Sequence, residues 1–362
     1  MKVRAALLLV VMTVALARLP LLGARLAGHD EALFQEPLQP PGLVRHAPTS
    51  WPLVAVGAAL LLLMLLPVLR RLLRPSPPAT LPPGPRAPFP AYGWAGLALA
   101  LISWAVAWGA VPSLLAGLRP YTFAPLWTGY VLVVLAWTKR RAGRNLLDEP
   151  RRLWGLTAVS AVFWWFFEYL NRFVESWSYS QIDLDGPLAV LLFGVLPFAT
   201  VLPAVAATSD LLRTVPRIDA AFGKLAPVQM RLPRVLGALV AAGGLLGLTG
   251  LSLAPNVLFP LVWLAPLLVL TGAQAALGMP HIFSRLGRGD GRRLVTWALA
   301  ALICGVFWEG WNWLSLARWT YAVPFVDQPR LFEMPLLGYA GYLPFGWECE
   351  AVAELIAPER RT

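Results

Sequence analysis

The stretch FWWFFEYLNRFVESWSY, residues 163–179, decides the fold class. It opens as an aromatic, apolar run and then places Glu168 and Asn171 three residues apart, on one face of a helix. A Trp-x-Tyr pair ends it. A carboxylate at membrane depth costs at least about 2.5 kcal/mol on insertion scales, so such a group is commonly paired or functional. The stretch therefore predicts a membrane helix that carries a site.

The composition of the whole chain is typical of helical membrane proteins. Of the 362 residues, 58% are hydrophobic and only 14% are charged, whereas soluble domains carry about 25% charged residues. The alternation of a transmembrane barrel is missing. We predict an all-α, polytopic transmembrane helix bundle of about ten spans. The apolar segments are 5–27, 52–69, 91–118, 123–138, 153–174, 187–212, 235–254, 257–277, 294–316 and 335–357.

The formal charge of +11 follows from this topology. If the N-terminus is cytoplasmic and the spans alternate, most Lys and Arg residues fall in cytoplasmic loops, as the positive-inside rule requires. The charge therefore needs no nucleic-acid partner. We expect the inner (cytoplasmic) membrane of a bacterium, with both termini cytoplasmic.

The first apolar segment allows two interpretations. MKVRAALLLVVMTVALA, residues 1–17, has the basic start and small-residue end of a signal peptide. Apolar character resumes after Arg18, however, which favours a retained first span.

A proline-rich stretch, RPSPPATLPPGPRAPFP, divides the chain and predicts an extended spacer. The expected parts follow from it. They are an N-terminal transmembrane hairpin (1–74), a cytoplasmic linker (75–90), a four-span repeat A (91–212), a basic cytoplasmic loop (213–234) and a four-span repeat B (235–362).

The eight segments after the linker contain an internal duplication. FAPLW (123–127) returns as FPLVW (259–263), and VFWWFFEYLNRFVESWSY (162–179) returns as VFWEGWNWLSLARWTY (306–321). In both copies Glu precedes Asn by three residues and a Trp-x-Tyr follows. Because four is an even number of spans, the two copies are expected to have the same orientation, related by an axis along the membrane normal.

Together the copies predict an intramembrane Glu/Asn pocket in the outer half of the bilayer, where membrane lipid or a hydrophobic small molecule would bind. The candidate catalytic residues are Glu168, Glu309 and Glu348. The candidate substrate-binding residues are Asn171, Asn312, Trp177, Tyr179, Trp319, Tyr321, Tyr339 and Tyr342.

Each candidate also has a structural interpretation. Glu168 could pair with Arg172 four residues on. Glu309 could stay a neutral carboxyl bonded to Asn or Trp, because burial favours the protonated form. Glu348 could make a helix-packing hydrogen bond, and the tryptophans could anchor the chain in lipid.

Other chemistries lack their motifs. None of the three His residues lies at a metal-ligand spacing from another His or from a Cys, so we predict no metal centre and no cofactor. Cys304 and Cys349 lie in apolar runs and are expected to be inert thiols. Walker, HExxH and serine-elbow motifs are absent, which argues against phosphoryl transfer and proteolysis.

The order of an aromatic helix, a Trp-x-Tyr and a proline-containing helix with carboxylates resembles integral-membrane lycopene cyclases, a carotenoid and isoprenoid family. In that family a Trp-x-Tyr precedes Pro-x-Glu-Glu within a tandem membrane repeat. Here Trp319 and Tyr321 precede Pro344 and Glu348 in PFGWECE, without the adjacent Glu pair. The likeness covers about the last third of the chain. The chain is also similar to a class of bacterial multi-pass membrane proteins.

Three functions fit these patterns. The first is an enzyme doing acid-base chemistry on a lipid or isoprenoid, with a protonated Glu309 or Glu348 as the acid and aromatic faces stabilising a developing cation. The second is a proton-coupled carrier that uses the same pocket. The third is a non-catalytic subunit of a membrane complex.

Overall fold

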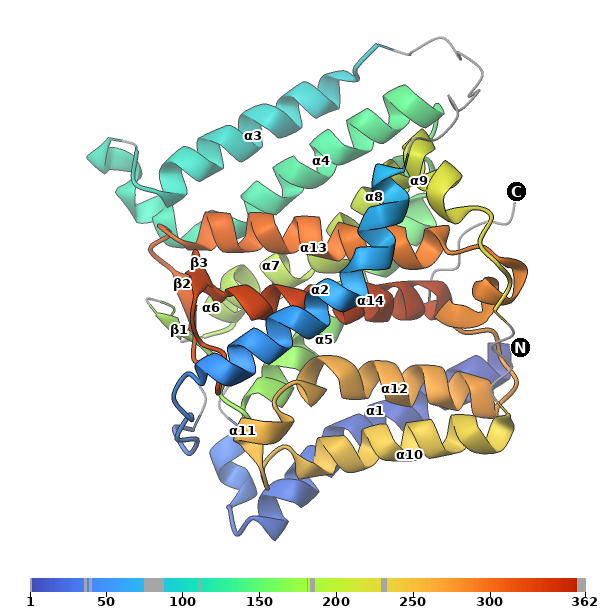
Figure 1. Cartoon of the computed structure of the whole chain (residues 1–362). Helices are drawn as coiled ribbons and strands as arrows, with labels where there is room; N and C mark the ends of the chain where they lie inside the picture. Colours follow the sequence, from blue (N-terminus) through green and yellow to red (C-terminus); the bar gives the residue numbers. More distant parts are fainter. Residues whose placement is uncertain are drawn as a thin grey trace.

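A computed structural model describes residues 2–35, 38, 41–74, 88–110, 112–180, 182, 186–228 and 233–356. Within these ranges the chain is mostly helical and contains two short two-stranded sheets (Figure 1). The short strands are an addition to the expected all-α class. Thirteen residues of the proline-rich linker, 75–87, lie outside the described residues, as do residues 357–362 of repeat B.

The α-helices of the first half are α1 (Lys2–Leu26), α2 (Trp51–Leu73), α3 (Ala91–Ala107), α4 (Phe123–Ala142), α5 (Pro150–Asn171), α6 (Pro187–Val190), α7 (Leu196–Phe198) and α8 (Val201–Arg213). Those of the second half are α9 (Pro216–Phe222), α10 (Arg234–Gly250), α11 (Pro255–Leu258), α12 (Leu261–Ala276), α13 (Arg292–Asn312) and α14 (Tyr342–Ile356).

Between these helices lie shorter elements. The 3₁₀ turns are η1 (Glu31–Phe34), η2 (Ser113–Tyr121), η3 (Leu146–Asp148), η5 (Ile282–Arg288) and η6 (Leu336–Gly341), and η4 (Leu191–Val195) is a π-helical turn. The strands are β1 (Trp177–Ser180), β2 (Arg318–Tyr321), β3 (Arg330–Leu331) and β4 (Met334–Pro335).

Length and hydropathy support four membrane spans among the described residues. They are α2, α5, the continuous run Pro187–Arg213 that contains α6 to α8, and α13. Residues Leu114–Tyr121 and α4, joined at a 72° bend, make a fifth if counted together. The apolar helices α3, α10 and α12 are shorter than 18 residues. Each of the ten predicted apolar segments contains helix, and four or five qualify as spans by these criteria.

The helices lie in layers around a buried centre (Figure 1). α5, α8, α13 and α14 supply much of the main hydrophobic cluster. α3 and α4 lie on one side of this centre, and α1, α10 and α12 lie on the other, with α2 crossing diagonally in front (Figure 1). The two helices of residues 1–74 thus take different places: α1 packs against α10, and α2 contacts α9 and η6.

Glycines let two helix pairs approach backbone to backbone, one pair in each half of the chain. On α12, a Cβ added at Gly272 would lie 2.5 Å from the backbone nitrogen of Ala241 on α10. On α4, a Cβ added at Gly129 would lie 2.6 Å from the carbonyl oxygen of Gly96 on α3. Small residues at such crossings are typical of membrane helices, where packing rather than the hydrophobic effect drives association.

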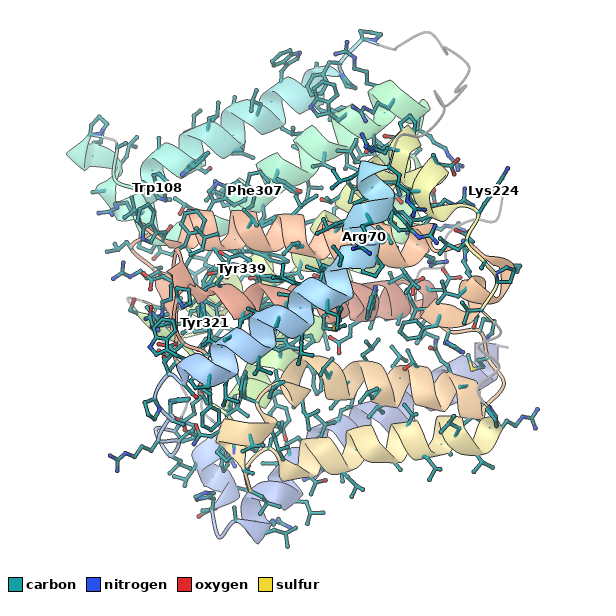
Figure 2. All side chains as sticks on the ribbon, viewed as in Figure 1. Arg70, Trp108, Lys224, Phe307, Tyr321 and Tyr339 are labelled. Carbon is teal, nitrogen blue, oxygen red and sulfur yellow. The ribbon has the colours of Figure 1, made fainter. Side chains whose placement is uncertain are left out.

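The two ends of the bundle differ in chemistry. Arg70 and Lys224 lie toward one end, which we call the basic end, and Tyr321 lies toward the other, which we call the sheet end (Figure 2). α4 reaches the basic end with Lys139, Arg140 and Arg141 in its last turn, where cations complement the helix dipole. α1 begins and α14 ends on the same side of the bundle (Figure 1).

Candidate functional site

An asparagine at the end of α13 holds the returning chain at the sheet end. The amide nitrogen of Asn312 donates to the carbonyl of Trp319 at 2.7 Å, and the backbone N–H of Trp319 donates to Asn312 Oδ1 at 2.9 Å. An asparagine side chain offers both a hydrogen-bond donor and an acceptor, so it can pair with the backbone C=O and the backbone N–H of the same residue. We call this arrangement the asparagine clamp.

The same clamp occurs at the end of α5. Asn171 donates to the carbonyl of Trp177 at 2.7 Å and accepts from its N–H at 3.2 Å. Asn171 and Asn312 are only 3% and 1% exposed. Water cannot reach these groups, so the backbone of each Trp depends on the asparagine for its hydrogen bonds. Each asparagine therefore holds the backbone of the Trp in the strand that follows its helix.

The two clamped segments then pair with each other. β1 and β2 run antiparallel, with Trp177 opposite Tyr321 and Tyr179 opposite Trp319. Both Trp-x-Tyr motifs thus form the two strands of one sheet. Trp177 is only 5% exposed, which differs from the lipid-facing position that an interfacial anchor would take.

Glu168 accepts three hydrogen bonds from aromatic side chains. Trp164 Nε1 and Tyr179 OH donate to Oε1 at 2.9 and 2.5 Å, and Trp177 Nε1 donates to Oε2 at 3.1 Å. Arg172, one turn further on, directs a guanidinium nitrogen to the carbonyl of Phe34. The buried carboxyl of Glu168 is therefore held by indoles and a phenol.

Glu309 has an equivalent place in the second half. The hydroxyls of Tyr321 and Tyr342 both donate to Glu309 Oε1 at 2.8 Å. Trp319 Nε1 donates to the hydroxyl of Tyr321 at 2.9 Å. An indole can only donate, so the Tyr321 oxygen accepts this bond and the Tyr321 proton stays available for the carboxyl. Glu309 Oε2 has no hydrogen-bond partner among the described residues, and the side chain is fully buried.

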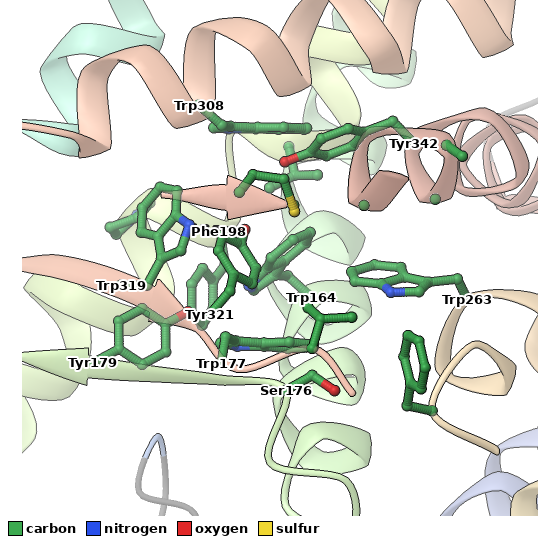
Figure 3. A pocket seen from close by; sticks show the side chains of 18 of the residues that line it. Trp164, Ser176, Trp177, Tyr179, Phe198, Trp263, Trp308, Trp319, Tyr321 and Tyr342 are labelled. Carbon is green, nitrogen blue, oxygen red and sulfur yellow. Dashed lines mark hydrogen bonds between the residues drawn. The ribbon is translucent and has the colours of Figure 1, made fainter. Parts of the chain in front are cut away.

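A cavity of about 470 Å³ lies beside these carboxyls (Figure 3). Ligand pockets typically measure about 300–1,000 Å³. Trp308 and Tyr342 lie on one side of the space and Trp177 lies on the opposite side (Figure 3). Its aromatic lining consists of Tyr121, Phe123, Trp164, Trp177, Tyr179, Phe193, Phe198, Phe259, Trp263, Trp308, Trp319, Tyr321, Tyr342 and Trp347.

Glu168 and Glu309 do not line the cavity themselves. The aromatic residues that donate hydrogen bonds to them do. Among the described residues, the lining contains no Asp, Glu, Lys, Arg or His, and neither Asn171 nor Asn312 lines it. Tyr321 and Tyr342 do, so a hydroxyl stands between Glu309 and the space. Burial, followed by the charge of nearby Glu309, raises the pKa of Tyr321 well above its ordinary value, and its hydroxyl keeps a proton to donate.

Two predicted residues have other surroundings. Glu348, on α14, accepts from the backbone N–H of Leu267 on α12 at 2.9 Å, one residue after Pro266 interrupts that helix. Tyr339 donates to the carbonyl of Leu331 at 3.1 Å. Neither residue lines the cavity. Within the described ranges, no group of three or more His, Cys, Asp and Glu side chains could hold a metal ion.

Sequence reasoning missed several cavity residues. Trp164 lies four residues before Glu168, and this i, i+4 spacing is a signal that places them on one helix face. Trp263 ends the repeated FPLVW motif, and Trp308 directly precedes Glu309. Ser176 had no signal of its own, because only the fold brings a residue just before β1 to the cavity wall.

Comparison of the chain with protein-family models, with curated proteins and with solved structures gives no match.

Proposed function

We propose that this protein binds a lipid or an isoprenoid within the membrane and performs acid-base chemistry on it at the aromatic cavity. The observation that carries the proposal is the pair of tyrosines, Tyr321 and Tyr342, that both line the cavity and donate to Glu309. A cavity of this size and apolar lining fits a hydrocarbon chain.

The chemistry follows from the order of the groups. A protonated Glu309 can give its proton to the hydroxyl oxygen of Tyr342 or Tyr321 as the hydroxyl proton of that tyrosine passes to the bound molecule, and the reverse transfer protonates Glu309 again. Each hydrogen bond on this path is 2.8 Å long, within the reach that general acid-base catalysis needs. Glu309 is then the proton store and a tyrosine is the group that touches the substrate, while the neighbouring indole faces would stabilise a cation that develops there.

The proposal includes a membrane arrangement. We place ten spans across a bacterial inner membrane, with the basic end in the cytoplasm and the sheet end outside. We also propose that repeats A and B are tandem copies in one orientation. The two asparagine clamps, the β1–β2 pairing and the glycine contacts in α3–α4 and α10–α12 support this duplication.

Lipid-extract mass spectrometry would test the chemistry. Cells expressing the wild type would be compared with cells expressing the Glu168→Gln/Glu309→Gln pair at matched protein levels. A glutamine oxygen can still accept the tyrosine bonds at both positions, and Glu168→Gln loses only the acceptor of Trp177 Nε1, so the fold should persist while proton transfer stops. We expect a lipid species to change only with the intact carboxyls.

Glu354→Gln is the control for removal of a carboxylate away from the cavity, because Glu354 pairs with Arg293 on the opposite part of α13. Lipid profiles that are identical in all three strains would contradict the enzyme proposal. A change that Glu354→Gln also produces would point to a general effect of lost charge.

A carrier is the second candidate, favoured by one observation. Residues Leu114–Tyr121 and α4 meet at a 72° bend that breaks the helical run, and Tyr121 and Phe123, on either side of the bend, line the cavity. Interrupted helices at binding sites are a feature of transporters. Uptake of a labelled lipid into proteoliposomes, with the lipid chemically unchanged and the uptake lost in Glu309→Gln, would favour the carrier over the enzyme.

A further inference from the structure

α2 is the least buried of the four helical runs that are long enough to span a membrane. Only 6% of its most apolar stretch is buried inside the protein, against 33% to 56% in the other three. It crosses the front of the bundle diagonally and contacts α9 and η6 (Figure 1). A segment with few buried contacts has few to break when it moves, so α2 is the span that is displaced at the lowest cost.

One face of α2 lies over the cavity. Gly57, Leu61, Met64 and Val68 follow one another at helical spacing, so they share this face. A Cβ added at Gly57 would lie 2.9 Å from the side chain of Leu337 in η6, and Val68 packs against the hydrophobic cluster of α9. Leu61 and Met64, between these two contacts, line the cavity. The middle of the face therefore has the cavity beneath it, and its two ends have protein.

The wall of the cavity is one side chain thick at Met64. This residue lines the cavity and is also 72% exposed, the largest exposed fraction among the described lining residues. Tyr121 and Leu264 follow with 43% and 39%. Methionine is unbranched and flexible, so its side chain moves aside easily. Because the outer surface of a membrane span faces lipid, a hydrophobic molecule has its shortest path to the cavity here.

Both ends of α2 are held by hydrogen bonds. Ser50, the residue before the helix, donates its N–H to the carbonyl of Phe325 at 2.7 Å. Near the other end, the guanidinium of Arg217 donates to the carbonyl of Leu72. These bonds tie α2 to the segment after β2 and to α9. The middle of the helix can therefore move more readily than the helix as a whole.

Two residues that weaken a helix lie on either side of this middle stretch. Pro67 is inside α2 and has no N–H to donate to the carbonyl of Leu63, which removes one hydrogen bond of the helix and favours a bend. Gly57 has no side chain, and its backbone is the least restricted of any residue type. The segment between Gly57 and Pro67 can thus bend outward while both ends of α2 stay in place.

We propose that α2 is a gate through which the ligand enters the cavity sideways from the membrane, by outward bending of the segment between Gly57 and Pro67. The inference rests on the proposed function, since it concerns how the hydrophobic molecule of that site reaches it. Entry past a lipid-facing helix keeps such a molecule out of water on its whole path.

The experiment measures how fast a hydrocarbon reaches the cavity. The full-length protein is reconstituted into phosphatidylcholine vesicles, and a long-chain hydrocarbon that carries a diazirine is added. A flash of light at timed intervals attaches the probe, and fragmentation in a mass spectrometer locates the label on Trp308 or Tyr342. Both residues line the cavity and are otherwise buried, so their labelling reports entry rather than contact with the outer surface.

A disulfide between Gly57→Cys and Leu337→Cys would lock the gate, because position 57 lies against the side chain at position 337. We expect oxidation to slow the labelling about tenfold or more, and a reductant to restore the wild-type rate. The final extent of labelling should not change. The control is a disulfide between Ser178→Cys and Thr320→Cys, which face each other across β1 and β2 and leave α2 free. It should leave the rate unchanged.

Pro67→Ala tests the bend without a cross-link. Alanine supplies the missing N–H for the carbonyl of Leu63 and stiffens α2, so entry should slow. Pro20→Ala is the matched control, because Pro20 also lies inside a helix, α1, but does not line the cavity. It should leave the entry rate as in the wild type.

The outcomes separate this inference from the proposed function. If neither Trp308 nor Tyr342 of the wild type is ever labelled, the two fail together. If the wild type is labelled and both the locked protein and Pro67→Ala are labelled at the same rate, the cavity binds hydrocarbon but α2 is not its gate. Slower labelling with the β1–β2 disulfide alone would also overturn the gate and would place the entrance at the sheet end.

Discussion

Ser178 and Thr320 lie directly opposite each other in the β1–β2 sheet, although 142 residues separate them in the sequence. Their hydroxyl oxygens are 3.5 Å apart and both side chains belong to the outward face of the sheet. This pairing joins the segment after α5 to the segment after α13, and the cavity wall depends on it.

A disulfide should therefore form between Ser178→Cys and Thr320→Cys under mild oxidation. Directly opposite residues have Cβ atoms about 4.5–5.5 Å apart, which a disulfide can bridge, whereas diagonal neighbours lie about 7–8 Å apart. Intact mass and mobility on a non-reducing gel check the bond. Ser180→Cys with Thr320→Cys is the diagonal control. Equal cross-linking of both pairs would contradict the register. Cys304 and Cys349 are buried and should stay reduced.

Removing an asparagine clamp should destabilise the protein, although the asparagine itself does not line the cavity. In Asn312→Ala, the N–H and the carbonyl of Trp319 both lose their partner, and buried unpaired groups cost about 1–3 kcal/mol each. We expect the free energy of unfolding in detergent to fall by about this amount or more. Thr320→Ala, in the same sheet but less buried, should change it by less than about 0.5 kcal/mol. A clamp variant as stable as Thr320→Ala would remove Asn312 from the scaffold.

Glycine to alanine changes should have opposite signs at two positions of the α10–α12 pair. At Gly272 the new Cβ would lie 2.5 Å from the nitrogen of Ala241 and 2.7 Å from the carbonyl oxygen of Gly237. Backbone atoms cannot move aside singly, so the helices must separate, at a cost of about 1–3 kcal/mol. At Gly243 nothing lies within 4 Å, and alanine should stabilise the helix by up to about 1 kcal/mol. Thermal unfolding of the two variants checks this; a stable Gly272→Ala would refute the close crossing.

Glu348 should be needed as an acceptor rather than as a charge. Glu348→Gln keeps an oxygen for the N–H of Leu267, so its unfolding free energy should stay near that of the wild type. Glu348→Leu leaves that N–H unpaired and should cost about 1–3 kcal/mol. If the leucine variant were instead more stable, because it removes a buried carboxyl, the hydrogen bond would not be what holds α14 to α12 at this point.

The sequence was informative where a side chain acts along its own helix. Composition predicted the helical membrane class, and the spacing of Glu309 and Asn312 placed them on one face of a helix. It could not show where the chain returns after the helix ends. The pairing of Asn312 with the backbone of Trp319 depends on that return. The sequence does not reveal such a pairing, because every residue except proline has the same backbone N–H and C=O.

The same limit applies to the cavity. Glu168 and Glu309 were expected to face a polar pocket. Instead, tyrosines of β2 and α14 lie between Glu309 and the cavity. Glu168 is bound by a tryptophan and a tyrosine of β1, which also line the cavity. Only tertiary packing decides which side chain of a buried polar pair reaches a cavity. Ser176 is the clearest case, since serine is common in turns and nothing nearby in the sequence distinguishes it.

The asparagine clamps bind backbone groups, so the hydrogen bonds that hold the strands do not depend on the side chains that line the cavity. The bonds to Asn312 and Asn171 use only the backbone of positions 319 and 177, so any residue except proline, which has no N–H, can make both of them. Substitutions at these two positions therefore change the wall of the cavity while the clamp bonds that hold the backbone remain. A lineage built on this framework can exchange one hydrophobic ligand for another without first losing its fold.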